Sequence, residues 1–134
     1  MSDQLELIHK AEIFVKDFFS KNHQSKYVYH NLQHTQETVE VAKKLALEYE
    51  LEGFSTLALT LAAWFHDTGY LIKSEKHEEI SSQIFEDFLK KEGISNPELT
   101  NKVIKIIRST ELGILPENLE EKIMCDADLS HLGG

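Results

Sequence analysis

Hydrophobic residues recur along the chain at helical spacing, and no stretch shows the alternation typical of a strand. In residues 4–19 the apolar side chains are expected to form one broad stripe, made of Leu5, Ile8, Phe14, Val15, Phe18 and Phe19. The polar stretch SKNHQSKY separates this helix from a second one. The second helix is expected to begin near Asn31, a suitable N-cap residue, and to run to Leu51, with Gly53 as its stop signal.

The segment FSTLALTLAAWFHDTGYL begins a third helix near Ser55 that is apolar nearly all round until His66. Such a helix is expected to be buried on every side, and Gly69 is expected to break it. Asn96 and Pro97 form a cap and a first-turn proline for a later helix. Three further helices are expected over residues 75–91, 97–109 and 118–129. The pattern therefore predicts an all-α bundle of about six helices.

The length of 134 residues and the hydrophobic content of 41% fit one globular domain with a real core. The chain stops soon after an acidic cluster, at DADLSHLGG, without an obvious closing element. We therefore expect residues 1–134 to form one domain, and leave open that it is the N-terminal part of a longer protein.

The composition narrows the location of the protein. The single cysteine, Cys125, excludes an internal disulfide and fits a reducing cytoplasm. No apolar run reaches the roughly 18 residues of a membrane span, and the acidic opening does not resemble a secretory signal. We expect a cytoplasmic protein without membrane contact.

The net charge of −9, with Arg108 as the only arginine, argues against binding of a nucleic acid polymer. A small anionic substrate is compatible with this charge, since a bound metal cation can reverse the local field. The sequence leaves open whether the chain acts as a monomer or as a homodimer.

A histidine and an aspartate, His66 and Asp67, end the most hydrophobic segment. Burying such groups is costly unless they are paired or bind a metal, although the helix could also simply end there in solvent. The second helix offers His34 and the last helix offers Asp126 or Asp128. Divalent cations accept imidazole and carboxylate ligands from separate elements. The order His, His-Asp, Asp therefore predicts a metal site.

The chain resembles the HD-domain metal-dependent phosphohydrolase superfamily, which is named for the His-Asp pair. YHNLQH, LAAWFHDTGY, KHEEIS and DADL occur in the order found in that family. The resemblance implies an HD-domain helical bundle with one divalent ion (Mn, Mg, Fe, Co, Ni or Zn) at its centre. The implied ligands are His34, His66, Asp67 and Asp128; Asp126 is then a neighbour that supports them, or the ligand itself if the alignment slips by two residues.

The opening of the second helix, YHNLQH, is similar to the Tyr-His-Asn-x-x-His motif of class I cyclic nucleotide phosphodiesterases. That similarity implies that His30 is a general acid which protonates the leaving oxygen. The alternative is that His30 packs or caps at the helix entrance. The residues after His-Asp, TGYLIK, lack the further histidine of those enzymes, so cyclic nucleotide specificity does not follow.

The resemblance implies hydrolysis of a small phosphoester, such as a nucleotide, by a metal-activated water that Asp67 helps to orient. Substrate phosphate is expected to contact His77, Lys73 or Arg108, each of which could instead be an ordinary surface residue. His77 could also hold a second metal, but the lack of further histidines in the fifth helix favours a single ion.

Two other classes of function stay open. The domain could be a non-catalytic regulatory module that binds metal and nucleotide. It could also be a metal-dependent oxygenase, because that chemistry occurs on the same scaffold, but a second iron would then be needed.

Overall fold

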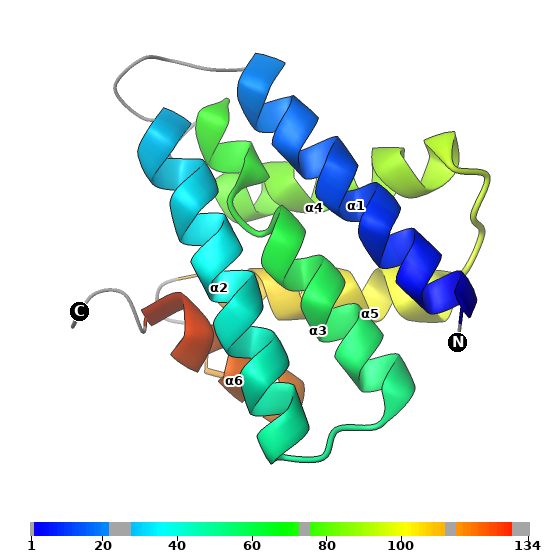
Figure 1. The fold of residues 1–134 in the computed structure, drawn as a ribbon, viewed down its shortest axis with the longest axis vertical. Helices are drawn as coiled ribbons and strands as arrows, with labels where there is room; N and C mark the ends of the chain where they lie inside the picture. The colour runs from blue at the N-terminus through cyan, green and yellow to red at the C-terminus, as the bar shows by residue number, and fades with distance from the viewer. Residues whose placement is uncertain (1, 22–27, 73–75, 112–114, 130–134) are drawn as a thin grey trace.

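The structure of the chain is a computed structural model, which describes residues 2–21, 28–72, 76–111 and 115–129. At residues 2–3, 28–31, 70–71 and 129 it describes the backbone alone. Among the described residues there are six α-helices and one 3-10 helix, and no strand (Figure 1). The helices are α1 (Ser2–Lys21), α2 (Val28–Glu48), α3 (Gly53–Phe65), η1 (Thr68–Leu71), α4 (His77–Lys91), α5 (Pro97–Arg108) and α6 (Leu119–Leu129). The predicted all-α bundle is confirmed.

Helix α3 is the centre of the bundle. Helices α1, α2, α4, α5 and α6 all contact it, with α2 beside it and α5 crossing behind it in Figure 1. All residues of Leu57–Phe65 are buried. A helix that is covered on every side must be apolar on every side, so the prediction made for this segment is confirmed.

The end of α3 is anchored by aromatic packing. The ring of Phe65, the last residue of α3, lies 5.7 Å from that of Phe14 in α1, measured between ring centroids. It also lies 5.2 Å from the rings of Phe85 and Phe88 in α4. Aromatic pairs at such distances stabilise a core beyond the area they bury. This packing fixes the position of Phe65, and therefore also that of the backbone of the next two residues, His66 and Asp67.

Both ends of helix α2 differ from the prediction. Helix α2 begins at Val28, so Asn31 lies inside it and is not its N-cap. Its C-terminus is closed by Glu50, which has a φ of 54°. The amide of Glu50 donates to Leu47 O, and the amide of Leu51 donates to Ala46 O. This is a Schellman motif with glutamate where glycine is usual, and Gly53 begins α3 instead of ending α2.

Except for Leu5, the stripe predicted on α1 faces the core: Val15 and Phe19 are buried, and Ile8, Phe14 and Phe18 pack against it partly buried. Leu5 is 70% exposed, whereas four residues spaced by four positions are buried: Leu7, Ala11, Val15 and Phe19.

The predicted cap of α5 is confirmed, because the amide of Leu99 donates to Asn96 Oδ1 over 3.1 Å. The cap residue predicted from the sequence is therefore confirmed for α5, whereas the one predicted for α2 is wrong.

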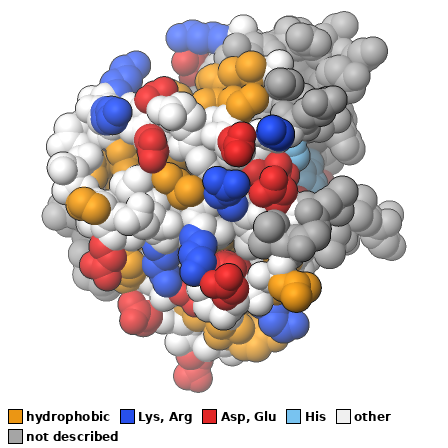
Figure 2. Space-filling model, turned by 180° about the vertical axis from the view of Figure 1, so that it is seen from behind, with side chains coloured by type: hydrophobic (Ala, Val, Ile, Leu, Met, Phe, Trp, Pro, Cys, Tyr) orange, Lys and Arg blue, Asp and Glu red, His pale blue; other side chains and the backbone are white. Residues whose placement is uncertain are grey.

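The described surface in Figure 2 carries acidic and basic side chains intermingled, with apolar side chains between them. On this face no basic stripe is seen among the described residues, as a nucleic acid polymer would need. No described helix combines the length and the hydrophobicity of a membrane span.

Candidate metal centre

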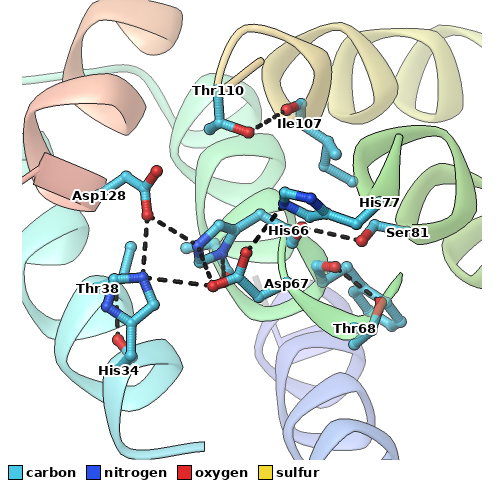
Figure 3. A network of polar contacts seen from close by, with 12 residues as sticks. His34, Thr38, His66, Asp67, Thr68, His77, Ser81, Ile107, Thr110 and Asp128 are labelled. Carbon is cyan, nitrogen blue, oxygen red and sulfur yellow. Dashed lines mark hydrogen bonds and ion pairs between the residues drawn. The ribbon is translucent and has the colours of Figure 1, made fainter. Parts of the chain in front are cut away.

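The four expected metal ligands come together at one place (Figure 3). His34 comes from α2, His66 and Asp67 from the turn after α3, and Asp128 from the end of α6. One potential ligand atom from each residue lies within 4.8 Å of all the others. Residues up to 94 positions apart in the sequence therefore form one cluster, as the His34–Asp128 pair shows.

Both imidazole rings of the cluster face both carboxylates. His34 Nε2 lies 3.0 Å from Asp128 Oδ1 and 3.4 Å from Asp67 Oδ2. His66 Nε2 lies 3.1 Å and 3.4 Å from the same two oxygen atoms. Two nitrogen and two oxygen atoms thus converge, which is a donor set that divalent transition metals accept.

The second nitrogen of His66 is held by the backbone. His66 is only 1% exposed, and its Nδ1 lies 2.8 Å from the carbonyl oxygen of Ala63. A carbonyl oxygen only accepts, so Nδ1 carries the proton of that bond. In the neutral ring the lone pair is then on Nε2, which faces the cluster, and this is the arrangement usual for metal-binding histidines.

The two carboxylates and His66 stabilise each other's charges. Burial favours neutral acids, but His66, His77 and His34 outweigh it and hold the pKa of Asp67 far below its usual range. Against the same effect of burial, hydrogen bonds from His34 and His66 lower the pKa of Asp128. Burial disfavours the charged form of His66, yet Asp67 and Asp128 raise its pKa well above the usual value.

These residues fit a divalent cation. Two carboxylates that stay ionised so close together require nearby positive charge, which either protonated imidazole or a metal ion can supply. A bound ion would take the place of the protons between the imidazole nitrogens and the carboxylate oxygens. The potential ligand atoms already point toward one another, so the residues present suit the metal that the resemblance implies.

His77, at the start of α4, adjoins the cluster from the other side of Asp67. Its Nε2 lies 3.4 Å from Asp67 Oδ1 and 3.1 Å from Glu78 Oε2. Asp67 therefore uses one oxygen toward the two histidines of the cluster and the other toward His77. This position is compatible with the expected contact between His77 and a substrate bound beside the metal.

Asp126 and Arg108 form ion pairs with residues outside the cluster. The carboxylate of Asp126 is exposed, 4.0 Å from Lys122 Nζ. Two residues along a helix turn the side chain by about 200°, so Asp126 and Asp128 cannot share a face. Arg108 is half-exposed at the end of α5, 3.8 Å from Glu79 and 4.0 Å from Glu111. Its guanidinium is thus held by carboxylates outside the cluster.

Two expected site residues lie outside what the structure describes. The backbone of His30 belongs to α2, but its side chain is outside the described residues. Lys73 lies outside the described residues altogether. For both, the expectation from the sequence stays a prediction.

The sequence analysis overlooked Ser81, whose hydroxyl contacts the backbone of the His-Asp turn. Ser81 Oγ donates to His66 O over 2.9 Å (Figure 3) and accepts from Gly69 N over 2.8 Å. A signal for it exists, because Ser81 follows His77 by four positions and so occupies the same face of α4.

Comparison with known proteins gives one match. The family model described as HD domain matches residues 31–132. This range holds the whole cluster, from His34 to Asp128, and covers well over half of the chain. Searches of curated proteins and of solved structures gave no match.

Proposed function

The chain belongs to the HD domain family, and from this premise we propose that it is a metal-dependent phosphohydrolase acting on a small phosphoester such as a nucleotide. One observation supports the proposal most. Imidazole and carboxylate atoms from His34, His66, Asp67 and Asp128 lie within 4.8 Å of one another. The tautomer of His66 that suits a metal is selected by Ala63 O.

When bound, a divalent ion would supply Lewis-acid activation of water and neutralise charge on a phosphoryl group. The residues that would hold it are His34 and His66, through one imidazole nitrogen each, and Asp67 and Asp128, through one carboxylate oxygen each. Asp67 keeps its Oδ1 toward His77, so Asp67 and His77 together can orient a water and a phosphate beside the ion. His30 is the proposed general acid, on the strength of the sequence motif alone.

The charge of the cluster makes phosphate binding depend on the metal. Asp67 and Asp128 repel an anion until a cation neutralises them. His77 is the proposed first contact for phosphate outside the metal, with Lys73 and Arg108 as further contacts. Arg108 would exchange two carboxylate partners, the exposed Glu79 and the partly buried Glu111, for phosphate, and the ion pairs lost are long and therefore weak.

The first test is the metal content of the purified protein, measured by elemental analysis beside Asp67→Ala and Asp87→Ala variants. Asp87 is exposed on α4 and serves as the matched control. We expect near-stoichiometric divalent metal in the parent and in Asp87→Ala, and loss of it in Asp67→Ala. Equal and negligible metal in all three, even after reconstitution, would contradict the proposal.

The second test is hydrolysis by the metal-loaded protein. Phosphate monoesters, phosphodiesters and common nucleotides are assayed with each of the metals Mn, Mg, Fe, Co, Ni and Zn. Turnover that is lost in Asp67→Ala supports the enzyme. Stabilisation by a nucleotide without any product would instead identify a regulatory module that binds metal and nucleotide.

A further inference from the structure

Two side chains of α4 contact the turn that carries two of the proposed ligands, His66–Gly69: His77 faces the Asp67 carboxylate, and the buried hydroxyl of Ser81 binds the backbone of the turn. We infer that Ser81 is a positioning residue, which sets the relative orientation of His66 and Asp67 for metal binding. The inference rests on the proposed function, because it requires the cluster to bind a metal.

The hydroxyl of Ser81 bridges the two ends of this turn. It donates to the carbonyl of His66, the first residue (Figure 3), and accepts from the amide of Gly69, the fourth. In an ordinary β-turn these two groups bond to each other directly. Here the oxygen of Ser81 lies between them, while Asp67 adopts a φ of −108° and a ψ of 6°, in a sparsely populated backbone region.

The turn lies so close to α4 that only glycine fits at position 69. A Cβ on Gly69 would be 2.2 Å from His77 O and 2.7 Å from Ser81 N. This close approach allows the short side chain of Ser81 to reach the turn. Ser81 is 0% exposed, so water is not at hand to replace its hydroxyl. Its loss would leave a buried carbonyl and a buried amide without that partner.

The orientation of the proposed ligands His66 and Asp67 depends directly on the backbone geometry of this turn. His66 supplies the carbonyl that Ser81 binds, and Asp67 is the next residue. Without the hydroxyl, the carbonyl of His66 and the amide of Gly69 can approach each other, which would change the backbone angles of Asp67 and hence the orientation of its carboxylate relative to His66 Nε2. Partners that orient metal ligands from outside typically change metal affinity by about 10–100-fold.

Ser82 offers a matched control on the same helix. It is also buried, but its hydroxyl donates only within α4, to Glu78 O over 2.9 Å. The experiment is calorimetric titration of Mn²⁺ into chelator-treated parent, Ser81→Ala and Ser82→Ala, at a temperature where circular dichroism shows all three folded. We expect the Kd to rise about tenfold or more for Ser81→Ala. For Ser82→Ala the Kd should stay within about twofold of that of the parent, because a serine hydrogen bond inside one helix contributes little to stability and does not reach the turn.

The outcomes separate this inference from the proposed function. A parent that does not bind Mn²⁺ overturns both. A folded Ser81→Ala variant with the Mn²⁺ affinity of the parent overturns the inference alone. The same holds if its metal-free melting temperature falls while its affinity stays unchanged, which would show a merely structural contribution. If Ser81→Ala does not fold, Ser81→Cys replaces it, since a thiol nearly preserves the volume but is only a weak donor and acceptor.

Discussion

Two aspartates of α6 stand two positions apart, and their surroundings differ completely. Asp128 Oδ1 lies within 3.1 Å of an imidazole nitrogen of His34 and one of His66. Asp126 is exposed, with Lys122 as a distant partner at 4.0 Å. The rotation of the helix between the two positions explains the difference. Only Asp128 is therefore placed to bind a metal together with the histidines.

This contrast predicts opposite results for two otherwise similar substitutions. Asp128→Ala removes one of the four proposed ligand atoms. It should weaken Mn²⁺ binding by more than about 100-fold, which is more than the loss typical of residues that only orient a ligand. Asp126→Ala should leave the Mn²⁺ affinity unchanged. Calorimetric titration of both variants checks the prediction. A loss of binding in Asp126→Ala with binding retained in Asp128→Ala would show that the ligand assignment is wrong by two residues.

At the scale of elements, the contact between η1 and α4 holds the proposed metal centre against the core. It depends on Gly69, where a Cβ would overlap the backbone of α4 at 2.2 Å. Backbone atoms cannot move aside as the end of a flexible side chain can. The two elements would have to separate to admit even one methyl group.

Gly69→Ala should therefore lower the free energy of unfolding by about 3 kcal/mol, at the upper end of overpacking costs. Gly53→Ala is the control, because a Cβ there meets only Gln4 Oε1, at 3.8 Å. That substitution should be neutral or stabilise by up to about 1 kcal/mol. Urea denaturation of both variants measures the difference. Equal stabilities would contradict the close approach of η1 to α4.

A second link between elements joins α3, α5 and α6. Glu120 of α6 accepts from Ser55 of α3 over 3.2 Å and forms an ion pair with Lys102 of α5. Burial would raise the pKa of Glu120, but the hydrogen bonds, above all that from Lys102, outweigh it and lower the pKa. The folded protein therefore favours the ionised form of Glu120 more than the unfolded chain does.

The sign of the pH dependence follows from this lowered pKa. The stabilisation by Glu120 is fully present above its unfolded pKa of 4.5 and is lost as the pH falls through the lower folded value. At pH 7, Glu120→Gln should cost about 1–2 kcal/mol of unfolding free energy, and the difference from the parent should shrink toward pH 3. Urea denaturation at a series of pH values measures both.

The control for Glu120→Gln is Glu117→Gln. Glu117 pairs with Lys105 over 2.9 Å, but both side chains are largely exposed. Its loss should cost at most about 0.5 kcal/mol. A larger loss in Glu117→Gln than in Glu120→Gln would contradict the idea that the partly buried pair of Glu120 and Lys102 joins these helices.

At the scale of the whole molecule, the proposed metal centre connects distant parts of the chain. Its four residues come from α2, from the turn after α3 and from α6. The unfolded chain does not hold these residues together, so an ion binds the folded state in preference. Metal binding should therefore stabilise the fold as a whole.

Mn²⁺ at 100 times its Kd should raise the free energy of unfolding by about 2.7 kcal/mol. Thermal denaturation with Mn²⁺, and again after addition of a chelator, checks this increase and its reversal. Asp67→Ala should show no comparable increase. A similar increase in the parent and in Asp67→Ala would indicate that Mn²⁺ acts elsewhere on the molecule.

The sequence by itself determined the helices and the central place of α3. These features depend on hydrophobic periodicity and on cap residues such as Asn96, whose effects reach only a few positions along the chain. The sequence also indicated four candidate ligands, His34, His66, Asp67 and Asp128. The order of residues in a family motif can be read without knowing how the helices contact each other.

Only the tertiary structure decided what lies around those residues. The proton on His66 Nδ1 depends on Ala63 O, the second oxygen of Asp67 faces His77, and the turn between His66 and Gly69 is bridged by Ser81. The contacts to His77 and Ser81 bring α4 against the turn after α3. Periodicity gives the faces of each helix, but it does not give the angle and offset at which two helices pack. Those are set by the fit of side chains across the whole core.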